Sequence, residues 1–161
     1  MGSALLSQWV EGPEAITVVD PAGSEVPGGV TLVTDRAAIA DQRFDLVIAA
    51  VNGLAIGGGT EILLATDLRV VAPHAEISMP QVRLGIITGW EGYERLVRDI
   101  GFNRAMQVVT TGERLDAAEA YRLGLINKVA EDADVVGAAM QFVESFEKAA
   151  PLALGRAKRV I

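Results

Sequence analysis

The sequence predicts an α/β fold. Stretches typical of strands alternate with stretches typical of helices in the first half of the chain, and helices fill the second half. The apolar run 46–51 shows no polar–apolar alternation, which is typical of a strand buried on both faces. A chain of 161 residues, half of them apolar, fits one domain with a substantial core. We therefore expect a single domain over residues 1–161.

In chain order, the first half divides at proline and glycine positions into short elements. The state of residues 4–9 stays open. The pattern predicts strands at 15–19 and 30–33, a helix at 35–43 and the buried strand 45–51. A tight turn at Asn52-Gly53, the glycine loop with a helix after it, and strands at 68–72 and 77–79 follow.

The second half begins with a loop rich in apolar residues at 81–90. Helices are expected at 91–100, at 103–110 with Asn103 as cap, at 116–123, at 132–149 and from Pro151 to Ile161, with an extended segment at 125–130.

Three consecutive glycines, Gly57, Gly58 and Gly59, stand where a helix begins. Without a Cβ they let the backbone approach a ligand, and the first N–H groups of a helix have no partner within it. Such a position stabilises negative charge. Glu61 follows about one turn later. Amide donors beside a carboxylate suit a reaction in which a carbonyl oxygen becomes an oxyanion while a proton moves nearby.

Composition and missing motifs exclude several classes. A net charge of −7 argues against nucleic acid as a partner, and the absence of cysteine removes thiol chemistry and zinc–thiolate sites. We see no phosphate loop, dinucleotide fingerprint, serine-hydrolase elbow or metal-ligand spacing, so no metal is expected. The single histidine, His74, is expected to be a surface residue. No membrane span or signal peptide is evident, and a cytoplasmic protein is the default expectation.

The sequence resembles the crotonase superfamily, the enoyl-CoA hydratase/isomerase group, over residues 45–130. Three stretches carry the resemblance: IAAVNGLAIGGGTEILLATDLRVVA, ISMPQVRLGIITG and TGERLDAAEAYRLGLINKV. It implies a crotonase-like spiral of ββα units with a helical C-terminal segment at 132–161, shortened at both ends. It also implies acyl-CoA thioesters as substrates in fatty acid metabolism, no cofactor apart from the coenzyme A of the substrate, and a homo-oligomer, either a trimer or a hexamer.

The resemblance also implies the roles of individual residues. The N–H groups of Gly58 and Gly29 would hold the thioester oxygen as it becomes an enolate. Glu61 matches the first of the two glutamates that share a water in the hydratases, and the second falls on Gln81. Glutamine cannot supply a proton, so a two-carboxylate hydration loses half of its acid/base groups.

The substrate-binding residues expected from the resemblance flank these positions. They are Gly28, Gly57, Ile56, Leu84, Trp90 and Glu91. Simpler interpretations stay open for several of them: a helix-dipole partner for Glu61, a polar loop residue for Gln81, a solvated charge for Glu91, and core or interface packing for Trp90.

Two functions follow. The first is an acyl-CoA enzyme, a lyase or isomerase, that acts through an enolate with Glu61 as general acid/base. The second is a catalytically weak or inactive crotonase-fold subunit that acts by oligomer assembly. Gln81 and the short termini favour the second, while Gly58 and Glu61 favour the first.

Overall fold

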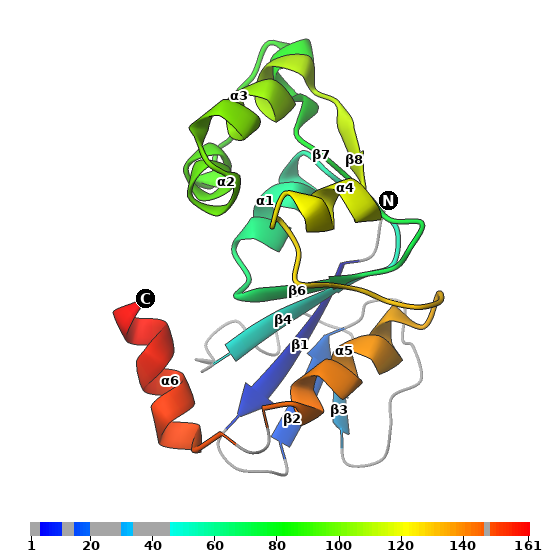
Figure 1. Cartoon of the computed structure of the whole chain (residues 1–161), viewed down its shortest axis with the longest axis vertical. Coiled ribbons are helices and arrows are strands. Elements are labelled where there is room, and N and C mark those ends of the chain that lie inside the picture. Colours follow the sequence, from blue (N-terminus) through cyan, green and yellow to red (C-terminus); the bar gives the residue numbers. More distant parts are fainter. Residues whose placement is uncertain (1–3, 11–14, 20–29, 34–45, 147–148) are drawn as a thin grey trace.

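A computed structural model of the chain describes residues 4–10, 15–19, 30–33, 46–146 and 149–161 (Figure 1). Its strands form two sheets. The strands are β1 (Ala4–Val10), β2 (Ala15–Val19), β3 (Val30–Val33), β4 (Leu46–Val51), β5 (Leu54–Ile56), β6 (Leu68–Val71), β7 (Glu76–Ser78), β8 (Arg114–Asp116) and β9 (Lys128–Val129). The helices are α1 (Gly58–Leu64), the 3₁₀ helix η2 (Pro80–Leu84), α2 (Gly92–Ile100), α3 (Phe102–Thr111), α4 (Ala117–Arg122), α5 (Val135–Glu144) and α6 (Pro151–Val160).

The chain repeats a ββα unit across the two sheets. In each unit the first strand joins the six-stranded sheet, of order β3-β2-β1-β4-β6-β9, and the second joins the three-stranded sheet, of order β5-β7-β8. β4, β5 and α1 form one unit, and β6, β7 and the helices η2 and α2 form the next. Equivalent strands pair in parallel, β4 with β6 and β5 with β7. The predicted α/β spiral of ββα units is confirmed.

The core explains why strand β4 lacks alternation. Ala49 and Val51 face one apolar cluster, which also contains residues of α1, α2, α3 and α4. Ile48 and Ala50 face a second cluster, together with Val135 and other residues of α5. Both faces of the strand are therefore buried, as the continuous apolar run predicts.

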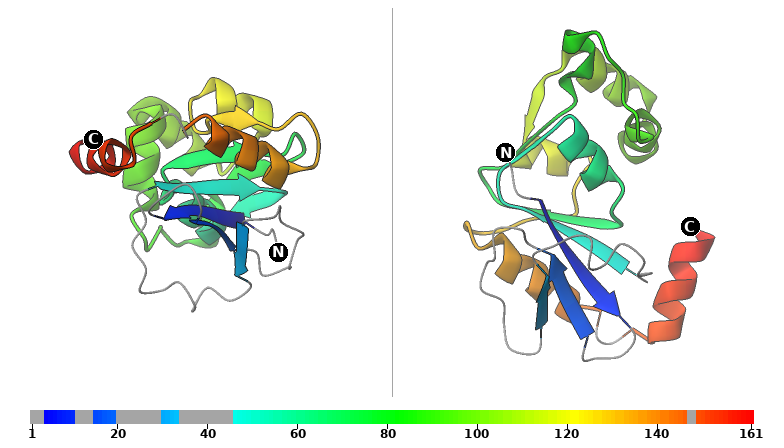
Figure 2. Two further views of the ribbon diagram at one scale, coloured as in Figure 1. Left: turned by 90° about the horizontal axis from the view of Figure 1, so that it is seen from below. Right: turned by 180° about the vertical axis from the view of Figure 1, so that it is seen from behind.

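Helices α2 and α3 lie at the end of the molecule away from β2 and β3, and α1 lies between them and the large sheet (Figures 1 and 2). Helix α6 stands at the side, where Lys158 contacts Asp67 at 2.8 Å. None of the helices in the described part of the chain is long and apolar enough to cross a bilayer.

Some element boundaries differ from the sequence prediction. The helix expected at 132–149 is shorter: α5 begins at Val135, where the Asp134 side chain caps it by accepting from Gly137 N at 2.9 Å, and ends at Glu144. Gly101, at φ 78°, and not Asn103, is the cap of α3. The extended segment expected at 125–130 contains only the two-residue strand β9. Strand β8 was not predicted, because three residues are too few to show the alternation typical of a strand. The helix expected at 35–43 lies outside the described residues.

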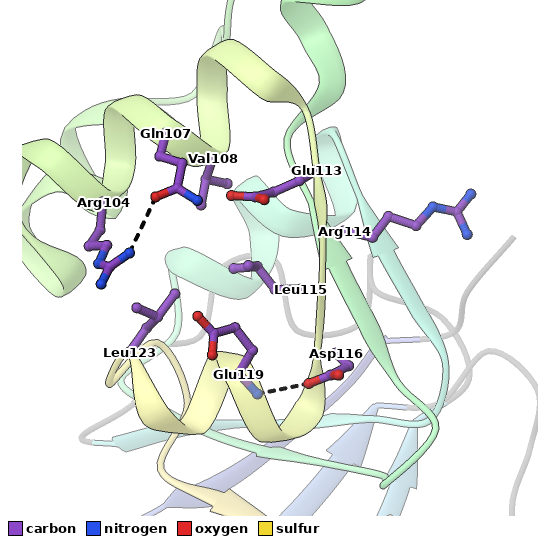
Figure 3. A pocket seen from close by; sticks show the side chains of 9 residues that line it. All are labelled: Arg104, Gln107, Val108, Glu113, Arg114, Leu115, Asp116, Glu119 and Leu123. Atoms are coloured by element: carbon purple, nitrogen blue, oxygen red, sulfur yellow. Dashed lines mark hydrogen bonds between the residues drawn. The ribbon is translucent and has the colours of Figure 1, made fainter.

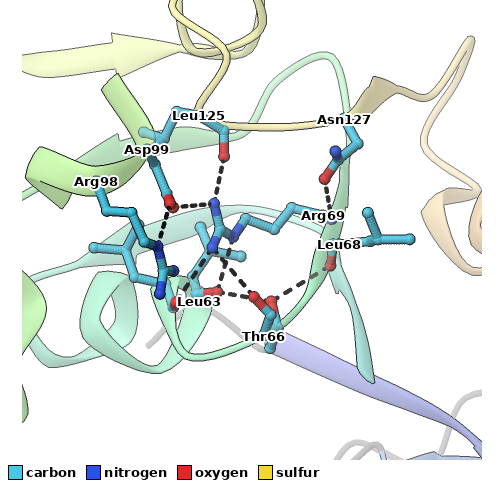
Figure 4. Close-up of polar contacts among 9 residues, drawn as sticks. Leu63, Thr66, Leu68, Arg69, Arg98, Asp99, Leu125 and Asn127 are labelled. Atoms are coloured by element: carbon cyan, nitrogen blue, oxygen red, sulfur yellow. Dashed lines mark hydrogen bonds and ion pairs between the residues drawn. The ribbon is translucent and has the colours of Figure 1, made fainter. Parts of the chain in front are cut away.

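A buried arginine joins α1, β6 and α2 (Figure 4). Arg69 is 5% exposed, and its guanidinium donates to Leu63 O and Leu64 O, carbonyls at the C-terminal end of α1. It also pairs with Asp99 of α2 at 2.7 Å and donates to Leu125 O at 2.9 Å. Cationic donors are favourable at a helix C-terminus, where carbonyls lack partners. This side chain therefore fixes α1 and α2 relative to each other.

Candidate active site

The glycine loop is held firmly at the start of α1. Gly57 has φ 58°, a conformation that favours glycine, and its N–H donates to Ser78 O at 2.9 Å. The buried Thr60 hydroxyl contacts Ala55 O at 2.6 Å and Ser78 O at 2.8 Å. Gly58 is the first residue of the helix. The loop is thus attached to both β5 and β7.

Glu61 is buried in the first turn of α1, with 5% of its surface exposed. Its Oε1 accepts from Gln81 Nε2 at 3.4 Å, and its Oε2 accepts from the backbone N–H of Trp90 at 2.8 Å. Its carboxylate therefore lies between η2 and the segment that leads into α2. Glu61, the proposed general acid/base, and Gln81, which occupies the position of the second glutamate, therefore lie together.

Gln81 is buried to the same degree, but only half of its amide is used. Its Oε1 finds no hydrogen-bond partner in the part of the chain that the structure describes. The turn that carries it is attached to the C-terminal end of α3, because Arg83 Nε donates to Thr111 O at 3.0 Å. An unpaired buried acceptor is unfavourable, so this oxygen is available to a hydrogen-bond donor on a ligand or a water.

The segment 90–92 packs against Glu61. Glu91 adopts the left-handed conformation at φ 61°, which is uncommon for a residue with a side chain. A Cβ on Gly92 would lie 2.6 Å from Glu61 Cγ, so only glycine fits there. The indole of Trp90 approaches Gly58: a Cβ on that glycine would lie 3.3 Å from Trp90 Cζ3.

Gly92 and Tyr93 are parts of this site that the sequence prediction missed. The Tyr93 hydroxyl is buried and has no partner among the described residues. Burial raises its pKa from the ordinary value of 10.0, and the negative charge of Glu61 raises it further. Gly92 could have been found from its position directly after Trp90 and Glu91, at the start of a predicted helix. No sequence pattern distinguishes Tyr93.

Other predicted residues do not join the cluster. The side chain of Leu84 is 73% exposed, and no described contact connects it with Glu61. The Glu91 carboxylate forms a surface ion pair with Arg95 at 3.1 Å, which agrees with the simpler interpretation as a solvated charge. Ile56 ends β5 and is partly buried. Gly28 and Gly29 lie outside the described residues, as does the loop that would supply the second oxyanion donor.

A pocket of about 300 Å³ lies away from Glu61, between α3, β8 and α4 (Figure 3). Its lining combines apolar side chains such as Leu115 and Leu123 with charged ones such as Arg104 and Glu119. It contains none of the predicted site residues. The described residues include no group of three His, Cys, Asp or Glu side chains that could hold a metal ion. His74 is exposed in its turn, as expected.

Comparison with known proteins places the chain in a family. A sequence model described as enoyl-CoA hydratase/isomerase matches residues 37–161. A short-chain-enoyl-CoA hydratase of Clostridium acetobutylicum is 40% identical over 115 residues, which cover 71% of this chain and 44% of that protein.

Two crystal structures are also similar. A carnitinyl-CoA hydratase from Mycobacterium avium has a TM-score of 0.67 and 43% identity, over 70% of this chain and 43% of that one. A Thermobifida fusca protein solved in complex with acetoacetyl-CoA has a TM-score of 0.66 and 34% identity, over 70% of this chain and 44% of that one. The chain spans less than half the length of these three relatives. The matched region includes the glycine loop, Glu61 and Gln81, and the chain belongs to the enoyl-CoA hydratase/isomerase family.

Proposed function

We propose that the chain acts on acyl-CoA thioesters through an enolate, with Glu61 as the one carboxylate that moves the proton. The observation that carries the proposal is the contact between Glu61 and Gln81. The buried partner of the carboxylate is an amide, which can position a group but cannot take or give a proton in the relevant range. Shuttling of one proton by one carboxylate therefore fits the site better than addition of water by two.

Double-bond isomerisation is the reaction that we favour. Glu61 takes a proton from the α-carbon of a 3-enoyl thioester, and the electron pair moves into the carbonyl to form a conjugated enolate. The N–H of Gly58, at the start of α1, stabilises the oxyanion, with Gly29 as the proposed second donor. The Glu61 carboxyl then returns the proton to the γ-carbon, which gives the 2-enoyl thioester. This isomerisation needs no water and no second acid.

Coenzyme A thioesters are the substrate class because the family relationship and the acetoacetyl-CoA complex of a relative both point to them. The oxyanion donors act on the thioester carbonyl, so no cofactor beyond the coenzyme A of the substrate takes part. Gln81, with its free acceptor oxygen, orients the substrate or a water.

The direct test supplies the purified chain with 3-enoyl-CoA and, separately, with 2-enoyl-CoA. We expect conversion of the 3-enoyl to the 2-enoyl thioester to exceed hydration of the 2-enoyl thioester. If hydration is faster than isomerisation, the proposed isomerase mechanism is wrong and a hydratase mechanism takes its place. No conversion and no exchange of the α-proton with solvent would remove the enzyme proposal.

We further propose that the chain assembles as a homo-oligomer, a trimer or a hexamer. Large apolar side chains stand exposed along α2 and α3: Val97, Phe102 and Met106 are 37%, 65% and 44% exposed. Exposed apolar surface of this kind favours a protein partner. If assembly is the whole function, multi-angle light scattering would report an oligomer while no thioester is turned over. A monomer at micromolar concentration would contradict the assembly proposal.

A further inference from the structure

We propose that Trp90 is a specificity-determining residue, which restricts the acyl group beside the thioester to one without an α-branch. The inference rests on the proposed function, because it takes Gly58 as the donor to the thioester oxygen. Trp90 Cζ3 and Cη2 would lie 3.3 and 3.9 Å from a Cβ on Gly58. The edge of the indole is therefore next to the proposed oxyanion donor.

The position of the acyl carbons follows from ordinary hydrogen-bond geometry. A carbonyl oxygen bound by the Gly58 N–H would lie about 2.9 Å from its nitrogen. The α-carbon is two bonds beyond that oxygen, and the Cβ position on Gly58 is two bonds from the same nitrogen. We therefore place the first carbons of the acyl chain in front of Gly58, beside the indole edge. A methyl branch on the α-carbon would enlarge the substrate where this ring stands.

The backbone of Trp90 is fixed, and its ring is largely exposed. The backbone N–H of Trp90 is bound to Glu61 Oε2, and the next two residues are confined by the left-handed conformation of Glu91 and the tight packing of Gly92. The Trp90 side chain is nevertheless 62% exposed, so it is not a core residue. A large aromatic ring held beside a site and not buried in a core is suited to contact a ligand.

The test compares two 3-enoyl substrates that differ by a single α-methyl group, but-3-enoyl-CoA and 2-methylbut-3-enoyl-CoA. The variants are Trp90→Ala and Trp90→Phe, and both retain the N–H that binds Glu61. A methyl group in a close-fitting site changes kcat/KM by roughly 10- to 200-fold. We expect Trp90→Ala to raise the ratio of kcat/KM for the branched to the linear substrate by about tenfold or more. Trp90→Phe should give a smaller increase.

The matched control is Ile87→Ala, an apolar residue of the same loop with 76% exposure. Its branched-to-linear ratio should equal that of the parent chain. An unchanged ratio in Trp90→Ala would overturn the role of Trp90, although turnover by the parent chain would leave the proposed function intact.

If the parent chain turns over neither substrate, calorimetric binding of butanoyl-CoA and 2-methylbutanoyl-CoA gives the same comparison without turnover. Preferential binding of the linear thioester, relaxed in Trp90→Ala, would support the role of the ring. Equal affinities in both proteins would overturn it. Failure of both thioesters to bind would remove the proposed function, and the inference with it.

Discussion

The backbone N–H of Trp90 donates a 2.8 Å hydrogen bond to Glu61 Oε2, across 29 positions of sequence. The two residues meet because α1 and α2 are fixed relative to each other, at their C-terminal ends by the Arg69–Asp99 ion pair. The carboxylate is thus positioned by a main-chain donor, which any residue except proline supplies at position 90. Substitutions of Trp90 therefore change the ring while the hydrogen bond to Glu61 is retained.

A second carboxylate should shift the reaction toward hydration. Gln81→Glu places a carboxyl group where the amide lies 3.4 Å from Glu61 Oε1, and two such groups titrate as a coupled pair. One can then hold a proton while the other accepts one, as water addition requires. We expect retained turnover and an increase in 2-enoyl-CoA hydration relative to isomerisation. The measurement is the ratio of the two rates. A ratio equal to that of the parent chain would show that residue 81 does not select the reaction.

An added methyl group at Gly92 should damage the site. The Cβ of Gly92→Ala would lie 2.6 Å from Glu61 Cγ and 2.9 Å from Met79 Cε, and the Glu61 carboxyl is held at both oxygens. Overpacking of this kind costs about 1–3 kcal/mol. We expect that loss in denaturant unfolding, together with a fall in turnover. Gly89→Ala is the control, since nothing lies within 4 Å of its Cβ. Equal stability of the two variants would contradict this packing.

The titration of Tyr93 should report the charge of Glu61. The chain has two tyrosines, so Tyr121→Phe leaves Tyr93 as the only one. We expect the absorbance midpoint of Tyr93 to lie above 10.0, chiefly because the hydroxyl is buried and secondly because Glu61 is negative. Glu61→Gln in the same background should lower the midpoint, but the contribution of burial should remain. A midpoint that stays the same in Glu61→Gln would show that the charge of Glu61 does not act on the Tyr93 hydroxyl.

The same pKa shift gives stability a pH dependence. The folded-state pKa lies above the unfolded one, so the stability that neutral Tyr93 contributes is fully present below pH about 10 and is lost as pH rises through the folded-state pKa. Tyr93→Phe should lose less stability over that alkaline range than the parent chain. Denaturant unfolding at several alkaline pH values measures the difference, and parallel curves would contradict it.

The buried ion pair should matter more than an exposed one. Asp99→Asn removes the charged partner of Arg69, whose side chain is 7% exposed, and breaking a buried pair costs about 3–5 kcal/mol. Glu76→Gln is the control, because its pair with Arg114 is largely exposed and is expected to contribute about 0–1 kcal/mol. Similar losses in both variants on chemical unfolding would mean that the Arg69 network does not fix α1 against α2.

The sequence was informative where local patterns decide the structure. The unbroken apolar run 46–51 predicted a doubly buried strand, and the glycines predicted the start of α1 at Gly58. The juxtaposition of Glu61 with Gln81 came from the family resemblance and not from spacing. Contacts between distant segments left no such pattern: Gly92 against Glu61, the hydroxyl of Tyr93 and the network of Arg69 depend on tertiary packing. The exposure of Leu84 could not be predicted either, because the sequence of an apolar loop does not show which of its side chains are buried.

The measurement that tests the central claim most directly is exchange of the α-proton of an acyl-CoA thioester in deuterated water, followed by NMR. The parent chain should catalyse this exchange, since Glu61 is proposed to form the enolate. Glu61→Gln preserves the shape of the side chain and should slow exchange by about 10²–10⁴-fold, the usual contribution of one general base, while thioester binding persists. Exchange at the parental rate in Glu61→Gln would show that Glu61 is structural and would contradict the mechanism.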